Sequence, residues 1–260
     1  MKDKNFWIWG KHSVEAVLEN YPESILEFQM LTDLKDHKAD GVESLVQLAQ
    51  DQGIKIKKVA NFPKDYGVKR HQGVLLSMKA APVGDIRDFN QALEVASEDK
   101  LYQWALLDRV EDPRNFGAIL RSAAAFGLSG VIFGGRNQAP VTGVVAQASA
   151  GQCFRVAMFE LGNTNQIFRS FDEASEAGQC EVAVASLDMD GQGLQEFAGE
   201  FKAKSGTRHV IWVLGSEGRG VRPGLLEKSS HKVSIPMEKS VESLNVSVAS
   251  ALAFYALYSQ

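Results

Sequence analysis

Residues 101–121 read LYQWALLDRVEDPRNFGAILR, and this stretch decides the fold class. Its first part, Leu101–Leu107, is a mostly apolar run of the kind found in strands that are buried on both faces. Asp112 and Pro113 follow, a pair that suits the N-cap and the first position of a helix. The apolar residues of that helix share one face: Phe116, Ile119, Leu120 and Ala123. A buried strand therefore runs through a short turn into a capped amphipathic helix.

Strands and helices keep alternating after this stretch. A helix is predicted over about 114–126, and further strands are predicted at 131–133, 181–187, 209–214 and 231–235. Such alternation predicts a parallel sheet that is covered by helices on both faces. We therefore expect an α/β domain over residues 101–260.

The last predicted helix, which runs through Tyr258, carries a wide apolar stripe. Its members are Val241, Leu244, Val248, Ala251, Leu252, Tyr255 and Tyr258. A stripe of this width is too broad for one shallow contact. We expect the helix to be deeply buried or to form part of an interface between copies of the chain.

Residues 1–80 have the pattern of a smaller α/β module. A strand followed by a helix is predicted over 5–20, then a strand at 25–31, a helix over 41–52, and strands at 54–59 and 73–78. Ala80–Asp85 combines chain breakers with polar residues, and residues 81–100 have weak periodicity. The sequence thus predicts a small domain over 1–80, a linker over 81–100 and a larger domain over 101–260.

Composition excludes several classes of protein. The chain has 260 residues, 45% hydrophobic and 23% charged, which is typical of a soluble globular protein. No apolar run approaches the roughly 18 residues that span a bilayer, so we expect a cytoplasmic protein that does not contact membranes. The two cysteines, Cys153 and Cys180, are far apart in sequence, and no two histidines have metal-ligand spacing. We expect no disulfide and no metal site.

The net charge of −4 is unevenly distributed along the chain. Residues 1–80 hold 12 Lys and Arg against 11 Asp and Glu, and residues 81–260 hold 16 against 21, which leaves charges of +1 and −5. The basic residues of the first part cluster near its end: Lys55, Lys57, Lys58, Lys64, Lys69 and Arg70. Such a cluster is typical either of a solvated face or of a patch that contacts phosphates, and composition alone leaves both interpretations open.

Ligands of parallel sheets bind beyond the carboxyl ends of the strands, and three loops are placed there. In the first loop and its helix, Arg114 and Arg121 lie about two turns apart on the face opposite the apolar stripe. They form either a solvated face or a pair that receives a phosphate. The second loop, Leu214–Val221, contains three glycines but matches neither a Walker A nor a GxGxxG pattern, and Glu217 within it would repel a phosphate. The third, Ile235–Ser247, precedes the last helix, which Ser243 or Asn245 can cap.

These three segments, in this order, resemble the motifs of the SPOUT superfamily, specifically the SpoU branch of RNA ribose 2′-O-methyltransferases that includes TrmH and RlmB. The first motif resembles Asp112–Gly117 together with Arg121, the second Gly215–Gly218, and the third Ile235–Met237 with Ser243–Ser247. Two N-terminal pieces, Gly10–Val14 and His71–Val74, resemble the small substrate-binding domain of RlmB-like 23S rRNA guanosine-2′-O-methyltransferases. The resemblance covers nearly the whole chain.

The resemblance implies a methyltransferase domain with a parallel sheet and a C-terminal trefoil knot, preceded by a small α/β substrate-binding domain. It implies that S-adenosylmethionine binds at the positions that match Gly215, Ile235 and Leu244. It also implies a homodimer and a set of residues around the reacting ribose hydroxyl: Arg121, Asn115, Glu217, Ser243 and Asn245. Residues expected to contact RNA are Lys55, Lys57, Lys58, Arg70 and Arg114. One position departs from the family, because Gln147 stands where a lysine is common.

We therefore expect an enzyme that methylates a ribose in structured RNA, with a guanosine of 23S rRNA preferred. A tRNA substrate is the alternative within the same class. A catalytically silent RNA-binding factor is the alternative from another class, and it would not need all five residues of the reaction set. A nicotinamide-dependent oxidoreductase is opposed by the missing GxGxxG pattern.

Overall fold

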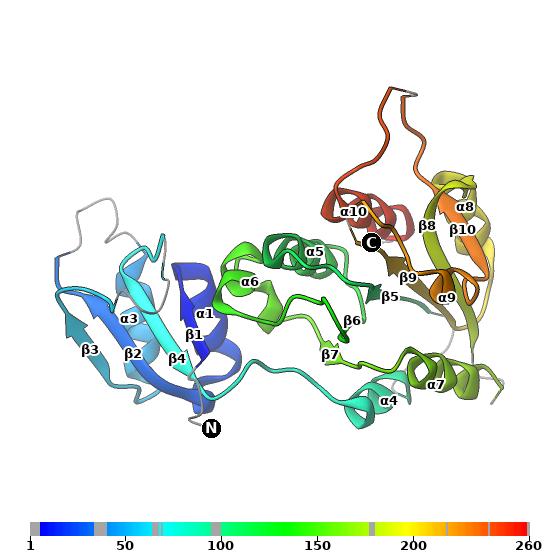
Figure 1. The fold of residues 1–260 in the computed structure, drawn as a ribbon. Helices are drawn as coiled ribbons and strands as arrows, with labels where there is room; N and C mark the ends of the chain where they lie inside the picture. The colour runs from blue at the N-terminus through cyan, green and yellow to red at the C-terminus, as the bar shows by residue number, and fades with distance from the viewer. Residues whose placement is uncertain are drawn as a thin grey trace. The chain divides into compact units, whose positions relative to one another are not determined.

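The computed structural model describes residues 6–33, 41–63, 68, 70–94, 100–176, 180–216, 218–238 and 240–258 (Figure 1). Contacts divide the chain into two units. The first comprises Met1–Pro82 and Val141–Arg155, and the second Val83–Pro140 and Val156–Gln260.

The first unit is built on a mixed four-stranded sheet in the order β1-β4-β2-β3. Its strands are β1 (Phe6–Trp9), β2 (Ile25–Leu31), β3 (Ile56–Val59) and β4 (Val74–Met78). Its main helices are α1 (Lys11–Asn20) and α3 (Val42–Asp51), and the short turn η1 (Pro22–Ser24) precedes β2. β4 is antiparallel to β1 and β2, whereas β3 is parallel to β2 at the sheet edge. The strands and helices predicted for this part of the chain are confirmed.

The first unit also contains a segment that comes from far along the chain. Helix α6 (Gly143–Ala148) and the turn η3 (Gln152–Phe154) pack against α1 and β1. The Ser13 hydroxyl donates to the Ala146 carbonyl at 3.0 Å, and Arg155 forms an ion pair with Glu19. A boundary at residue 80 omits this segment, because only packing at long sequence separation places it here.

The second unit is built on a six-stranded sheet in the order β10-β8-β9-β5-β6-β7, and all of its strand pairs are parallel. The strands are β5 (Leu101–Leu107), β6 (Gly130–Phe133), β7 (Met158–Glu160), β8 (Glu181–Gly193), β9 (Arg208–Leu214) and β10 (His231–Ser234). The predicted parallel α/β sheet is confirmed.

Helices cover both faces of this sheet. They are α4 (Ile86–Glu94), α5 (Pro113–Ala125), α7 (Thr164–Glu176), α8 (Leu194–Ala203), α9 (Pro223–Leu226) and α10 (Val246–Leu257). α10 packs against α5 and α8, whereas α4 packs against α7. Figure 1 shows α5 and α10 on one side of the sheet and α4 and α7 on the other. No described helix is long and apolar enough to cross a membrane.

The predicted linker over 81–100 is wrong for the part that forms α4. Phe89 and Leu93, one turn apart on that helix, are buried in the same apolar cluster as Trp104 of β5. Gly84 forms a β-bridge with Phe159 of β7. Ile86 and Ala92 are partly buried against the same cluster, but the helix has only nine residues, fewer than the roughly 11–18 over which helical periodicity is read in a sequence.

A buried histidine links the two central strands of the second unit. The Trp104 indole N–H donates to His209 Nδ1 at 2.9 Å, and the Tyr102 ring stacks on the imidazole. Burial lowers the pKa of His209 to about 4. The imidazole is therefore neutral near pH 7, with Nδ1 free of a proton and able to accept this hydrogen bond.

The apolar stripe predicted for the last helix is not the face that packs. The buried residues of α10 are Ser250, Ala253, Phe254 and Leu257. Val248, Leu252 and Tyr255, which belong to the predicted stripe, are 48%, 40% and 64% exposed. The helix is apolar all round, so periodicity alone does not identify which face meets the core.

Candidate active site

Asp108, directly after β5, organises the carboxyl end of the sheet. It is only 1% exposed, and its Oδ2 accepts a hydrogen bond from the backbone N–H of Arg222 at 2.8 Å. Oδ1 forms ion pairs with Arg222 Nε at 2.5 Å and with Arg109 Nε at 3.6 Å. Because a buried carboxylate needs such partners, Asp108 holds the loop that follows β9 close to the end of β5.

The loop after β9 approaches itself too closely for a side chain at Gly215. A Cβ there would lie 2.2 Å from the Gly220 carbonyl carbon and 2.3 Å from the Val221 nitrogen. The loop is closed by two backbone hydrogen bonds between Ser216 and Gly220, at 3.2 and 3.0 Å. Glycine is required at position 215 because the contacting atoms belong to the main chain and cannot rotate away.

The start of α5 is capped as predicted. Asp112 Oδ1 accepts from the Arg114 N–H at 2.7 Å, and Pro113 is the first helical residue. The preceding turn is held by Gln138, whose side chain accepts from the Val110 N–H and donates to the Val110 carbonyl, both at 3.1 Å.

Two asparagines join the starts of α5 and α10. Asn245 Oδ1 accepts from the Ser247 N–H at 2.8 Å, which confirms it as the N-cap of α10. The Asn245 amide donates to Asn115 Oδ1 at 3.1 Å. Residues 130 positions apart in sequence are thereby brought together at one place.

A pocket of about 250 Å³ lies beside this asparagine pair. Its lining includes Asn115, the neighbouring Val246, and a set of polar and charged residues: Arg109, Glu111, Asp112, Ser216 and Arg219. The Ser216 hydroxyl is buried and has no hydrogen-bond partner among the described residues. A buried hydroxyl without a partner is a place where a polar ligand group gains a hydrogen bond that the protein does not satisfy.

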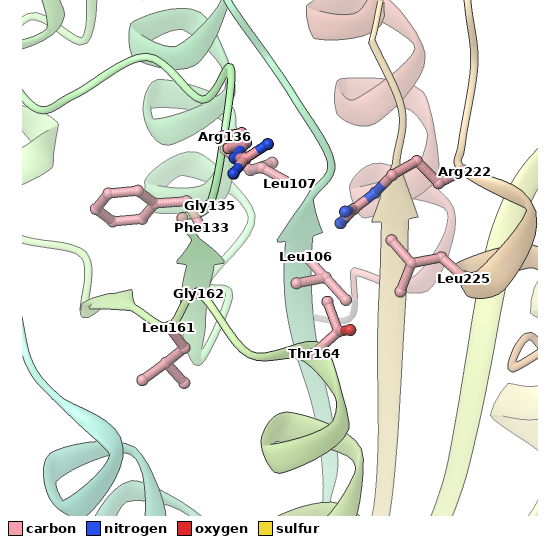
Figure 2. Close-up of a pocket in the computed structure, with 11 residues that line it drawn as sticks. Leu106, Leu107, Phe133, Gly135, Arg136, Leu161, Gly162, Thr164, Arg222 and Leu225 are labelled. Atoms are coloured by element: carbon pink, nitrogen blue, oxygen red, sulfur yellow. The ribbon is translucent and has the colours of Figure 1, made fainter.

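A second pocket, of about 280 Å³, opens at the carboxyl ends of β5 and β6 (Figure 2). Arg136 and Arg222 line it together with apolar residues of the strands. None of the residues expected to bind the cofactor or the reacting hydroxyl belongs to its lining.

The other residues expected around the reaction lie outside both pockets. Arg121 is an exposed residue of α5, and Ser243 is exposed ahead of α10. Ile235 and Leu244 are half-buried at the two ends of the segment between β10 and α10, which Figure 1 shows as a long loop extending away from the sheet. Glu217 lies outside the described residues.

The basic residues expected to contact RNA are exposed, but two of the lysines point away from each other. Lys57 and Lys58 are consecutive in the edge strand β3, so their side chains point to opposite sides of the sheet. Lys57 Nζ lies 3.4 Å from Glu27 Oε1, and this carboxylate offsets part of the positive charge of the lysine. Lys55 and Arg70 are exposed in the same unit, and Arg114 is exposed in the second unit.

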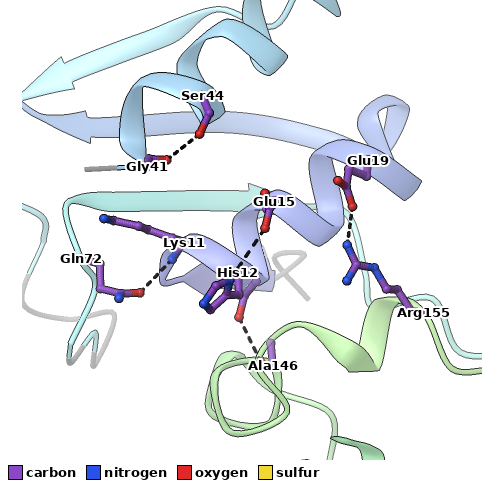
Figure 3. A network of polar contacts seen from close by, with 10 residues as sticks. Lys11, His12, Glu15, Glu19, Gly41, Ser44, Gln72, Ala146 and Arg155 are labelled. Atoms are coloured by element: carbon purple, nitrogen blue, oxygen red, sulfur yellow. Dashed lines mark hydrogen bonds and ion pairs between the residues drawn. The ribbon is translucent and has the colours of Figure 1, made fainter. Parts of the chain in front are cut away.

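Gln147, the position that departs from the family pattern, lies in α6 of the first unit. Its amide donates to the backbone carbonyl of Arg70 at 3.3 Å. Nearby contacts of the same unit are shown in Figure 3, including the ion pair between Arg155 and Glu19. The glutamine thus takes part in packing within the first unit.

Two models of known families match this chain. Residues 104–255 match the SpoU rRNA methylase family, and residues 7–83 match the RNA 2′-O ribose methyltransferase substrate-binding domain. The chain belongs to the SpoU rRNA methylase family. The family resemblance inferred from the sequence motifs is confirmed, and with it the assignment to the RNA 2′-O-methyltransferases.

Curated relatives match over almost their whole length. The 23S rRNA (guanosine-2′-O-)-methyltransferase RlmB of Acinetobacter baylyi is 31% identical over 96% of this chain and 95% of the relative. The protein of the same name from Shewanella oneidensis is 30% identical over 95% of this chain and 94% of the relative.

Solved structures show the same fold. The SpoU methyltransferase AviRb of Streptomyces viridochromogenes, in complex with AdoMet, has a TM-score of 0.73 at 21% identity and covers 98% of this chain and 89% of its own. An AdoMet-bound rRNA methyltransferase of Sinorhizobium meliloti has a TM-score of 0.72 at 21% identity. The match covers 97% of this chain and 86% of that protein.

Three residues that shape the candidate site were not among the expected site residues: Asp108, Arg109 and Gln138. Ser216 lies within the second motif, but the sequence assigned it no role. Asp108 carried a usable signal, since a carboxylate directly after a buried strand must find partners. Gln138 carried none, because its role depends on a turn that lies 28 positions away.

Proposed function

We propose that this chain transfers a methyl group from S-adenosylmethionine to a ribose 2′-hydroxyl of RNA, and that its substrate is a guanosine of 23S rRNA. The names of the relatives at about 30% identity support the substrate, and the substrate-binding domain model supports RNA. The structural observation that carries the proposal is the hydrogen bond between Asn245 and Asn115 beside the pocket that contains Ser216.

The residues present fit the cofactor. At Gly215 the loop's own main chain occupies the space that a side chain would need, which keeps the loop closed, and the unpartnered Ser216 hydroxyl next to it can bond a polar group. We assign cofactor binding to Gly215, Ile235 and Leu244, and the AdoMet-bound neighbours support this class of ligand. When bound, S-adenosylmethionine supplies a methyl group on a positively charged sulfur.

The chain's own residues orient the ribose and offset the charge that develops on its oxygen. We assign the placing of the hydroxyl to Asn115, Asn245 and Ser243, and the RNA phosphate to Arg121 and Arg114. Arginine stays protonated in proteins, so Arg121 does not remove the hydroxyl proton. Glu217 is the fifth residue that we assign to the surroundings of the ribose hydroxyl.

Transfer of a labelled methyl group to ribosomal RNA tests this function. The expected result is a single 2′-O-methylguanosine in 23S rRNA that is absent from RNA of cells lacking the protein. Methylation of tRNA instead would support the alternative substrate. RNA binding without methyl transfer would show a silent binding factor and contradict the proposal.

We further propose that the protein acts in the cytoplasm as a homodimer, and that its C-terminal segment forms a trefoil knot. Support for the dimer comes from α10, where Val248, Leu252 and Tyr255 are exposed at spacings of four and three residues on one helix face. Sedimentation is expected to show a dimer for the wild-type chain and a monomer for Tyr255→Glu.

A further inference from the structure

The pocket in Figure 2 has an apolar floor and a cationic rim. Leu106, Leu107 and Leu161 contribute to the floor, and Arg136 and Arg222 stand on opposite sides with the leucines of β5 between them. A volume of about 280 Å³ lies just below the roughly 300–1,000 Å³ of small-molecule sites. The space suits one flat, partly apolar group that carries a negative charge.

The charge of this pocket is positive although residues 81–260 are acidic overall. No carboxylate lines it within the described part of the chain. Asp108 Oδ1 pairs with Arg222 Nε at 2.5 Å, but the Arg222 side chain is 48% exposed, so the rest of its guanidinium is available to a ligand. Arg136 is exposed and has no ion pair among the described residues. Two guanidinium groups, only one of which is paired with a carboxylate, favour a phosphate.

One wall of the pocket is bare main chain. Gly134 and Gly135 have φ values of 140° and 85°, a region that glycine adopts without strain. A Cβ at Gly134 would lie 3.1 Å from the Leu161 carbonyl carbon, so the missing side chain there lets the loops after β6 and β7 pack against each other. At Gly135 the nearest atom to such a Cβ is 4.0 Å away, which leaves room for a ligand beside the backbone. Thr164, which also lines the pocket, is the first residue of the 13-residue helix α7, where the helix dipole adds to the positive potential.

The pocket adjoins the candidate active site. Leu107 lines this pocket, and Arg109 lines the pocket beside Asn115. Residues two positions apart lie within about 7 Å of each other. A nucleotide here would therefore be a direct neighbour of one held at the asparagine pair.

We infer that this pocket binds the nucleotide next to the methylated one in the RNA, with its base on the leucine floor and its phosphate between Arg136 and Arg222. The inference rests on the proposed function for the identity of the RNA. Occupation by S-adenosylmethionine is the competing explanation, although none of the cofactor positions Gly215, Ile235 and Leu244 lines the pocket.

Calorimetry with guanosine 5′-monophosphate tests the pocket independently of methylation. The wild-type chain is expected to bind this nucleotide, and to bind guanosine or inorganic phosphate at least about tenfold more weakly, because each lacks one half of the ligand. Arg136→Ala should weaken nucleotide binding by about tenfold, and Arg136→Lys by less, since a lysine still offers a positive charge. Arg169→Ala, an exposed arginine of α7 outside both pockets, is the matched control and should change nothing.

Three results would overturn the inference. If Arg136→Ala binds the nucleotide with the affinity of the wild-type chain, the arginine does not hold the phosphate. Equal affinity for inorganic phosphate and the nucleotide would show that the floor does not bind a base. Displacement of the nucleotide by S-adenosylmethionine would show that the pocket binds the cofactor.

A measurement of RNA binding shows whether this inference or the proposed function has failed. The slope of log affinity for 23S rRNA against log salt concentration should fall by about 1 in Arg136→Ala, while cofactor affinity stays unchanged. Nucleotide binding through Arg136 in a chain that methylates no RNA would count against the proposed function and leave the pocket supported.

Discussion

The two units place their charged residues in different ways, because one set lies at the ends of strands and the other along a strand. In the second unit every strand pair is parallel, so the carboxyl ends of β5, β6 and β9 meet at one edge, where Asp108 after β5 contacts Arg222 from the segment after β9. In the first unit β4 runs antiparallel to both neighbours, and the lysines of β3 lie on an edge strand with alternating directions. Side chains beyond the carboxyl ends of parallel strands meet at one place, whereas consecutive side chains along an edge strand point to opposite sides.

The largest expected effect tests the site of the second unit. Arg121→Ala should lower the rate of methyl transfer by about 10²–10³, because donors that stabilise developing charge typically contribute that much. Unfolding temperature should barely change, since Arg121 is exposed on α5. Turnover would be measured at saturating cofactor and RNA. Near-normal turnover of Arg121→Ala would show that Arg121 does not act in the reaction. A large drop in its unfolding temperature would show that Arg121 has a structural role instead.

A smaller effect concerns the core beneath that site. The pKa of His209 is about 4 in the folded chain, below its ordinary value of 6.5, so the unfolded state takes up the proton first as pH falls. Its contribution to stability is complete above about pH 6.5 and is lost toward pH 4, about 2–3 kcal/mol between pH 7 and 4.5.

Hydrogen exchange can locate this loss in one unit. Amides of β5 and β9 in the second unit should lose protection at pH 4.5, while amides of β4 in the first unit should lose less. In His209→Gln, whose side-chain oxygen can still accept from Trp104, the pH dependence between 7 and 4.5 should shrink. An unchanged pH dependence in this variant would show that another group is responsible.

The asparagine pair allows stability and activity to be separated. Asn245→Ala removes the cap of α10 and should cost about 1 kcal/mol of unfolding free energy. Asn245→Asp keeps an oxygen for the cap but cannot donate to Asn115, so it should retain stability and still lose methyl transfer. Full activity in the aspartate variant would mean that the pair serves only to cap the helix.

The smallest effect is expected at the lysines of the first unit. Replacing Lys55, Lys57 and Lys58 by Gln should weaken RNA binding by only about threefold to fivefold and lower its salt dependence slightly, because the side chains are spread and Lys57 is paired with Glu27. Filter binding at several salt concentrations would measure this. A loss of RNA affinity well above about tenfold would show that the edge of β3 is a focused RNA site.

Substitution is a cleaner test here than deletion of residues 1–80. α6 and η3 belong to the first unit, and the Phe154 ring lies 6.4 Å from Phe6 and 6.3 Å from Tyr21. A truncated chain would expose this buried ring and confuse loss of RNA contact with loss of folding.

Much of the fold could be predicted because its signals are local. The buried strand Leu101–Leu107, the capped helix that starts at Pro113 and the alternating strands of the first unit each carry a pattern within about ten residues. The cap at Asn245 belongs to the same class, since its partner Ser247 is two positions away. Helix α4 is not predicted, because its nine residues are fewer than the roughly 11–18 over which helical periodicity is read.

Which face of α10 is buried could not be predicted. The helix is apolar on all sides, so every face satisfies the local pattern equally. Contact with α5 and α8 makes the choice, and it buries Phe254 while leaving Tyr255 exposed.

By itself the sequence determined the class of each unit, the ends of the main helices and the family, because these depend on residue types at short spacing. Only the tertiary structure placed Asp108 against Arg222, Asn245 against Asn115, and Arg136 across a pocket from Arg222. Each of these pairs joins residues more than 80 positions apart. Such contacts arise when parallel strands bring their carboxyl ends to one edge, and no local pattern encodes which side chains then meet.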